Sequence, residues 1–171
     1  YVLEMADVVG YHLDGLPIYL VSPLTLAGDS FSAVIEYSDR VDSVWVLSMP
    51  SVGATAPIRV ADALAMSAAE VIGSAMILSE LLPHKIHWGT EIFPFDLRSM
   101  AMVFGSPESL LFQLATAEVY AWLHGTAWEP WGANIHTMAK EPGPQAASEK
   151  TGIMTSGAML GARHFSHGGT L

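Results

Sequence analysis

Short apolar runs alternate along the chain with longer segments in which apolar residues recur at helical spacing. The runs at 16–24, 42–50 and 85–92 are rich in Val, Ile, Leu and aromatic residues, and Pro23 and Pro50 close the first two. Runs of this length and composition predict buried β-strands. Two further strands are predicted at 127–136, where Pro130 and Gly132 interrupt the pattern, and at 162–168.

Helices are predicted in the segments that separate these strands. They span 30–40, about 62–82, 106–124 and 144–160. The second helix is rich in small residues, which allow a helix to pack closely on a sheet, and Pro83 ends it. Its predicted apolar face comprises Leu64, Ala68, Val71, Ala75 and Leu78. In the third helix, Ser106 is the predicted N-cap, Pro107 the first helical residue and Gly125 the C-terminal cap.

This alternation of strands and helices predicts an α/β fold with a parallel sheet and helices outside it. A doubly wound sheet and a (β/α)8 TIM barrel both fit the order, and the chain shows no Gly-x-Gly-x-x-Gly turn after a strand and no Walker loop. A closed barrel needs roughly 250 residues. We therefore expect a partial barrel of about four to five units, a single domain over residues 1–171 and a piece of a longer protein.

Composition and charge exclude several classes of function. The net charge is −10 and the 7 Lys and Arg residues are scattered, so a nucleic-acid partner is not expected. The chain has no Cys, which excludes disulfides and thiolate chemistry and is compatible with the cytoplasm, where we expect the protein. The charge-free run at 43–58 is too short and too broken by Pro and Gly to span a membrane.

Two pairs of histidines raise the possibility of a zinc site. They are His84 with His87 and His164 with His167. On a strand, a spacing of three directs the two rings to opposite faces, and no third ligand is evident beside either pair. We expect no intrinsic metal.

Four stretches together resemble one known family. They are "SPLTL" at 22–26, "GATAPIRVADALAMSAAEV" at 53–71, "FDLRSMAMVFGSPE" at 95–108 and "AKEPGPQAASEK" at 139–150. Their order resembles the corrinoid-dependent trimethylamine methyltransferase family, which includes demethylases of glycine betaine and other quaternary amines. The resemblance implies a TIM barrel that moves a methyl group from a small amine to the cobalt of a corrinoid (methylcobalamin) carried by a partner protein.

The resemblance also bears on the amine. Trimethylamine enzymes of the family carry pyrrolysine, and the printed chain shows no unusual residue, which favours a quaternary amine such as glycine betaine. A quaternary nitrogen already carries the charge that makes a neutral amine a leaving group. The protein then has to supply position, a cage for the cation and an anchor for any carboxylate.

Candidate site residues lie in the loops that follow the predicted strands. The substrate-binding candidates are Thr55, Asp96, Arg98, His136, Lys140 and Trp131, and the corrinoid-facing candidates are Thr25, Gly53, Ala54 and His167. Because a barrel gathers these loops at one face, we expect Thr25, Thr55, Arg98, His136 and His167 to point into one cavity. A purely structural role stays open for several residues of these loops. Gly53 would then make a tight turn, Asp96 and Arg98 an ion pair, Lys140 would be a solvated loop residue, and Trp128, Phe93 and Phe95 would belong to the core.

Two other functions remain open. Another TIM-barrel lyase or aldolase would use Lys140 as a Schiff-base residue, although such a lysine should be buried and desolvated. A non-catalytic or truncated homologue would only bind the corrinoid protein or assemble with itself as a homo-oligomer.

Overall fold

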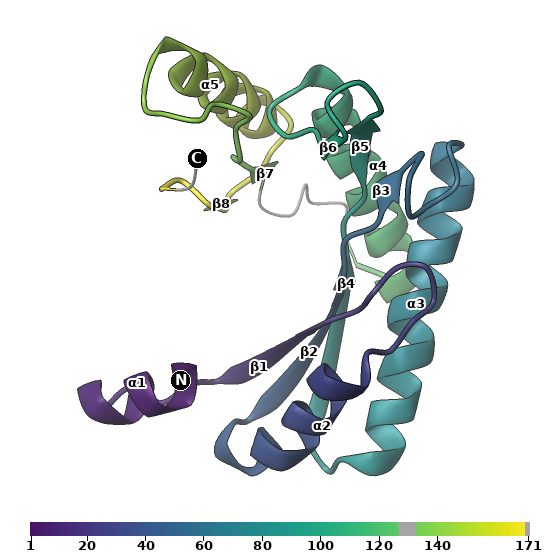
Figure 1. The fold of residues 1–171 in the computed structure, drawn as a ribbon, viewed down its shortest axis with the longest axis vertical. Coiled ribbons are helices and arrows are strands. Elements are labelled where there is room, and N and C mark those ends of the chain that lie inside the picture. The colour runs from purple at the N-terminus through teal and green to yellow at the C-terminus, as the bar shows by residue number, and fades with distance from the viewer. Residues whose placement is uncertain (127–132, 170–171) are drawn as a thin grey trace. The chain divides into compact units, whose positions relative to one another are not determined.

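A computed structural model describes residues 1–126 and 133–169 (Figure 1). The chain forms two compact units. The first comprises Tyr1–Pro50 and Ala65–Thr90, and the second comprises Ser51–Leu64 and Glu91–Leu171.

The first unit is built on a parallel three-stranded sheet. Its strands are β1 (Gly15–Tyr19), β2 (Ser43–Ser48) and β4 (Lys85–Thr90), in the order β1-β2-β4, with β2 paired in parallel to both neighbours. The connections are helical: α2 (Gly28–Tyr37) with a 3₁₀ turn (Ser38–Arg40), and α3 (Val60–Leu81). A further helix, α1 (Val2–Val9), precedes β1 and was not predicted. The three strands and two connecting helices confirm the predicted parallel α/β order.

One face of this sheet forms the core of the unit. Ile18 of β1 and Val44 and Val46 of β2 alternate along their strands, as period-two patterning requires, and are almost fully buried. Val34 of α2 and Leu78 of α3 belong to the same cluster. Both helices therefore cover the same face of the sheet. The predicted apolar face of α3 is confirmed, with Ala68 half-buried and the other four members buried.

Within the described residues, α3 is one helix long and apolar enough to cross a membrane by length and composition alone. Asp62, Glu70 and Glu80 interrupt its apolar sequence, so it is not a charge-free run. Its packing is that of a crossover helix, since Val71 and Leu78 lie in the sheet core and Glu70 is buried among hydroxyl groups. Length and hydropathy thus have a sufficient explanation in the core of the unit.

The second unit contains short strands and two long helices. β3 (Ser51–Val52) pairs in parallel with β5 (Phe93–Asp96), and β5 pairs antiparallel with β6 (Ala101–Met102). Residues 93–105, where no strand or helix was predicted, therefore hold a small hairpin. Its turn is organised by Asp96, whose carboxylate accepts hydrogen bonds from the backbone N–H groups of Arg98 and Ser99.

Helix ends in this unit follow the predicted capping residues. α4 (Pro107–His124) begins after Ser106, whose Oγ accepts a hydrogen bond from the N–H of Ser109 at 3.1 Å, and Gly125 ends it with a φ of 62°. α5 (Pro144–Met159) follows. β7 (Ala133–Asn134) pairs in parallel with β8 (Phe165–Ser166), within the two weaker predicted strands. Residues 127–132 of the first of these lie outside the described residues.

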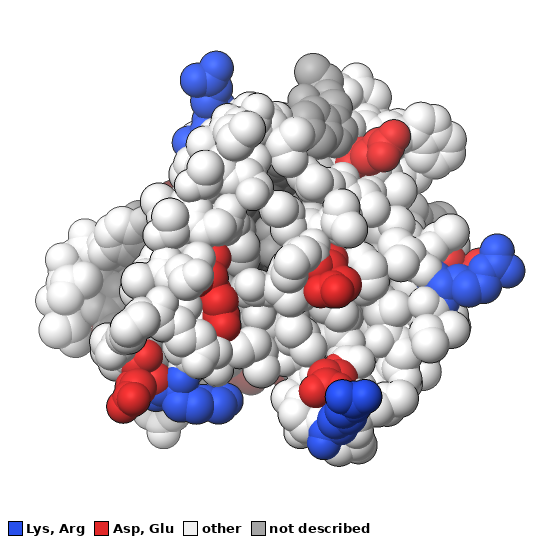
Figure 2. Space-filling model, turned by 90° about the horizontal axis from the view of Figure 1, so that it is seen from above, with Lys and Arg blue, Asp and Glu red and all other residues white. Residues whose placement is uncertain are grey.

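Charged side chains are dispersed over the surface. Figure 2 shows Lys and Arg side chains as separate groups on the visible face, interspersed with Asp and Glu. The dispersion matches the scattered basic residues in the sequence. Both units are α/β, and α2, α3 and α5 connect strands that pair in parallel. The partial TIM barrel stays a prediction.

Candidate functional site

A buried carboxylate lies at the carboxyl ends of the strands in the first unit. Glu70 of α3 is 4% exposed. Its Oε1 accepts a hydrogen bond from the N–H of Leu24 at 2.7 Å, and its Oε2 accepts bonds from the hydroxyls of Ser22, at 2.9 Å, and Ser48. Ser48 is the last residue of β2, and Ser22 and Leu24 lie in the loop after β1. One side chain thus connects the ends of two neighbouring strands.

The network extends to the third strand. Ser67, one turn before Glu70 on α3, donates to the Ser48 hydroxyl at 3.2 Å and hydrogen-bonds Thr90, the last residue of β4. Ser48 and Thr90 are register partners. Because burying a polar group is costly unless it is hydrogen-bonded, this satisfied network fixes one arrangement of the strand ends.

The loop after β1 adopts an uncommon backbone conformation. Leu24 has a φ of 50°, in the left-handed region that non-Gly residues seldom adopt. The loop is closed by backbone hydrogen bonds between Val21 and Thr25 in both directions. The Thr25 hydroxyl donates to the carbonyl of Pro23. Conformations of this kind persist only where the surroundings enforce them, and they cluster at functional sites.

The loop from Ser51 to Pro57 turns tightly and exposes small residues. The carbonyl of Ser51 accepts hydrogen bonds from the N–H groups of Ala54, Thr55 and Ala56, and the Thr55 hydroxyl accepts one from the N–H of Ser51 at 2.9 Å. Gly53 has a φ of 93°, and no atom lies within 4 Å of where its Cβ would be. Ala54 and Thr55 are exposed. Both interpretations of this loop, a tight turn and open access for a ligand, fit the geometry.

Two predicted site residues meet in the second unit. His136 follows β7 and His167 follows β8, and their rings stack with centroids 4.1 Å apart. Phe104 lies 4.9 Å from His136 and packs edge-on against Phe93 at 5.0 Å. We call these four side chains the ring row. Phe93 is fully buried and His167 is exposed, so the row runs from the core to the surface.

The charge state of His136 determines whether the ring row can accept a cation, and the nearby positive charge of Lys150 opposes one. Burial, together with the neighbouring His167 and Lys150, lowers the pKa of His136 below its usual 6.5, so the imidazole is neutral at pH 7. Neutral aromatic faces attract ammonium groups, whereas an imidazolium would repel them. His167 has a φ of 63°, a second non-Gly residue in the left-handed region at a strand end.

A second helix carboxylate holds the loop after His136. Glu149 of α5 accepts hydrogen bonds from the Thr137 hydroxyl, from the N–H of Met138 at 2.7 Å and from Nε2 of Gln145 at 2.8 Å. Burial raises the pKa of Glu149, but these bonds outweigh it and hold the pKa below its usual 4.5. Glu70 and Glu149 thus share one arrangement, in which a helix carboxylate takes a hydroxyl and a backbone N–H from a strand-end loop.

Two further residues, Gly105 and Lys150, have specific contacts in the same region. A Cβ at Gly105 would lie 2.6 Å from Oε2 of Glu149, and Gly105 has a φ of 72°. Only glycine meets both conditions without strain. Lys150 Nζ donates to the carbonyl of Gly168 at 2.8 Å, which ties α5 to the segment after His167.

The remaining candidates are half-buried, exposed or outside the described residues. Asp96 binds the backbone N–H of Arg98, and its pKa lies below the usual 3.8 because of that bond and the bond from the Ser99 hydroxyl. The Arg98 side chain is exposed, as is Lys140. Exposure of Lys140 argues against a Schiff-base role. Trp128 and Trp131 lie outside the described residues, and joint convergence of the five predicted loop residues stays a prediction.

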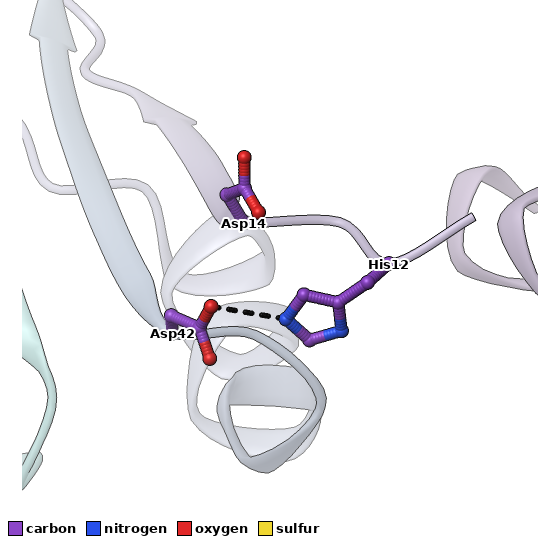
Figure 3. Close-up of side chains that lie close together, drawn as sticks. All are labelled: His12, Asp14 and Asp42. Carbon is purple, nitrogen blue, oxygen red and sulfur yellow. Dashed lines mark hydrogen bonds and ion pairs between the residues drawn. The ribbon is translucent and has the colours of Figure 1, made fainter.

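One group in the described chain has the ligand types of a metal site. His12, Asp14 and Asp42 place one ligand atom each within 4.8 Å of one another (Figure 3). His12 Nε2 already pairs with Asp42 at 3.0 Å, and all three residues are exposed. The group lies at the amino ends of β1 and β2, away from the strand ends that carry the Glu70 network. We assign it a structural ion pair.

Sequence reasoning missed Glu70, Glu149, Ser22 and Lys150. A signal for Glu70 was present, since Ser67, Glu70 and Ser74 recur at helical spacing beside the apolar face of α3, and all three are buried. A charged residue on a buried stripe needs partners, and hydroxyl-bearing residues end two of the strands. For Glu149 and Lys150, which lie on a helix with little apolar patterning, we find no comparable signal.

Comparison with known proteins identifies the family. A family model described as trimethylamine methyltransferase matches residues 16–170. Curated trimethylamine methyltransferases are similar: that of Methanosarcina barkeri is 31% identical over 142 residues, that of Methanosarcina thermophila 32% over 143, and that of Desulfitobacterium hafniense 30% over 145. Each alignment covers 82% of this chain and 28% or 29% of the relative, so the chain spans less than a third of their length. The chain belongs to the trimethylamine methyltransferase family.

Proposed function

We propose that this chain is part of an enzyme that transfers a methyl group from an amine to the cobalt of a corrinoid carried by a separate protein. The observation that carries the proposal is the family match over residues 16–170. The parallel strands with conformationally constrained loops at their carboxyl ends supply the kind of scaffold on which α/β enzymes build their sites. Because the relatives are much longer, the activity is proposed for the whole protein.

Transfer of a methyl group from a quaternary amine needs little acid–base catalysis. Reduced cobalt supplies the electron pair for the new carbon–cobalt bond, and the electron pair of the broken carbon–nitrogen bond leaves with the amine. The protein then has to position the amine and favour its charge. The ring row, in which a neutral His136 packs against His167 and Phe104, offers aromatic faces to an ammonium group. The exposed small residues of the Gly53 loop suit close approach of the corrinoid carrier.

Within this reaction, we favour a quaternary amine that carries a carboxylate, such as glycine betaine. The nitrogen of a quaternary amine becomes a neutral amine on loss of its methyl group, without prior protonation, which fits a ring row whose half-buried imidazole is neutral. An exposed Arg98 at the β5–β6 turn is available to a carboxylate. The relatives are named for trimethylamine, so trimethylamine is the competing substrate.

A substrate panel tests the proposal. The full-length protein and its corrinoid partner would be offered glycine betaine, trimethylamine and tetramethylammonium, with cobalt methylation followed by absorbance. Arg98→Ala should lower kcat/KM for glycine betaine by about 10- to 100-fold, because a charge-assisted hydrogen bond is worth about 1.5–3 kcal/mol. Tetramethylammonium has no carboxylate and should be unaffected.

Arg59→Ala is the matched control, because Arg59 is also exposed but pairs with Asp62. Equal loss on both cations after Arg98→Ala would assign Arg98 a structural role. Methylation from trimethylamine alone would overturn the preference for a quaternary amine. Corrinoid binding without methylation from any amine would favour a non-catalytic homologue.

A further inference from the structure

The buried carboxylate of Glu70 is not used in the proposed methyl transfer, yet it accepts three hydrogen bonds. It lies 4% exposed in the middle of α3, and both oxygens are engaged, one by the Leu24 N–H and the other by the hydroxyls of Ser22 and Ser48. A residue needed only for packing would be apolar at this position, since the adjacent Val71 and Leu78 fill the core. The choice of a carboxylate therefore needs another reason.

That reason lies in the loop between β1 and α2. Leu24 holds a φ of 50°, a conformation that L-residues other than Asn, Asp and Gly avoid. The Glu70 carboxylate accepts a hydrogen bond from the N–H of this residue and another from the hydroxyl of Ser22. The loop is thus held from the core side at both flanks of Pro23, while its outer side chains, Leu24 and Thr25, are exposed.

We propose that Glu70 is a positioning residue of the methyltransferase: its carboxylate holds Leu24 in the left-handed conformation and so sets the loop at 21–25 for catalysis. The inference rests on the proposed function, because it assigns the loop a part in methyl transfer. It also makes a claim about the loop alone, which is measurable without activity.

The first arm measures the loop. Hydrogen exchange of the full-length protein reports on the Leu24 amide through peptides that span 20–27. Glu70→Gln keeps the shape but replaces a charged acceptor with a neutral one, and we expect about tenfold faster exchange. Glu70→Ala removes the acceptor, and we expect about hundredfold faster exchange. Glu80→Gln, an exposed acid on the same helix, should leave the peptide unchanged.

The second arm measures turnover with the corrinoid partner. Glu70→Gln should lower kcat at least tenfold with the amine KM within twofold, and Ser22→Ala should lower it in the same direction. Val71→Ala is the stability control. Val71 is fully buried next to Glu70 in the sequence, but it takes no part in the side-chain hydrogen bonds of Glu70. It should destabilise the protein as much or more and keep its turnover at temperatures where it is folded.

The third arm is a double-mutant cycle that a merely structural role would not satisfy. Asn adopts the left-handed conformation more readily than Leu. In a Leu24→Asn background the loop depends less on the carboxylate, so Glu70→Gln should cost at most threefold in kcat rather than tenfold. This coupling reports that Glu70 acts through Leu24.

Several results would overturn the proposal. Leu24 exchange in Glu70→Gln as slow as in the wild type would show that the carboxylate does not hold the loop. Fast exchange with undiminished turnover would show that catalysis does not use the loop. Loss of turnover in Val71→Ala equal to that in Glu70→Gln would reduce the role to stability. A wild-type protein without methyl transfer would instead overturn the proposed function, and the exchange arm would still decide whether Glu70 holds Leu24.

Discussion

Gly105→Ala is the substitution whose effect the structure defines most closely. Gly105 has a φ of 72°, and a Cβ there would lie 2.6 Å from Oε2, 3.0 Å from Cβ and 3.1 Å from Cδ of Glu149. The stem of Glu149 cannot yield without moving its carboxylate. That carboxylate accepts the Thr137 hydroxyl and the Met138 N–H with the same Oε2 atom. The substitution should therefore release the loop after His136.

The magnitude has two parts. A left-handed alanine costs about 1–2 kcal/mol. Loss of one hydrogen bond to a charged acceptor costs about 1.5–3 kcal/mol more. The sum is about 2.5–5 kcal/mol of local stability. Gly125→Ala is the matched control, because Gly125 has a φ of 62° and nothing lies within 4 Å of the added Cβ, so it carries the backbone cost alone.

Hydrogen exchange at Met138 separates the two parts. In Gly105→Ala this amide should exchange about 10- to 100-fold faster than in the wild type, as loss of about 1.5–3 kcal/mol requires. In Gly125→Ala the same amide should keep its wild-type rate. If both variants left Met138 equally protected, Glu149 would not be the group that holds this loop.

Three further outcomes are expected. Folding lowers the pKa of His136, so its contribution to the free energy of unfolding is present above the ordinary value of 6.5 and is lost as pH falls below it. In urea titrations between pH 8 and pH 5, the free energy of unfolding should therefore fall less in His136→Asn than in the wild type. Ser106→Ala removes the α4 N-cap and should cost about 0.5–2 kcal/mol in thermal unfolding, and an unchanged transition would refute the cap. Gly15→Ala places a Cβ 2.7 Å from the Trp45 ring, which stacks on His87; it should shift Trp fluorescence and cost about 1–3 kcal/mol, and an unaltered spectrum would contradict the packing.

The elements with strong local signals were predictable, and those set by tertiary contacts were not. The apolar run at 42–50 and the capping residues Ser106 and Gly125 are local signals, and the structure confirms the strand and the caps that they predict. The β5–β6 hairpin escaped because each strand is short and its turn depends on Asp96 binding backbone N–H groups. No periodicity encodes such a turn.

The candidate site divides in the same way. His136 and His167 were candidates because both follow predicted strands, and in the structure their rings stack. The contact of His136 with Phe104, and the lowering of its pKa by burial, His167 and Lys150, involve residues from other parts of the chain and were not predictable. The supporting carboxylates Glu70 and Glu149 lie on helices, where we sought only packing. The loop candidates Thr25, Gly53 and Ala54 stay predictions about a corrinoid carrier.

Methyl transfer to cobalt is the central claim, and a single-turnover experiment with labelled substrate tests it most directly. The full-length protein would be mixed with its corrinoid partner in the reduced state and with glycine betaine or trimethylamine bearing deuterated methyl groups. We predict that one labelled methyl group per corrinoid appears on cobalt, with the demethylated amine in equal amount, and that omission of the protein abolishes both. A folded, partner-bound protein that leaves cobalt unlabelled with every amine would contradict the account.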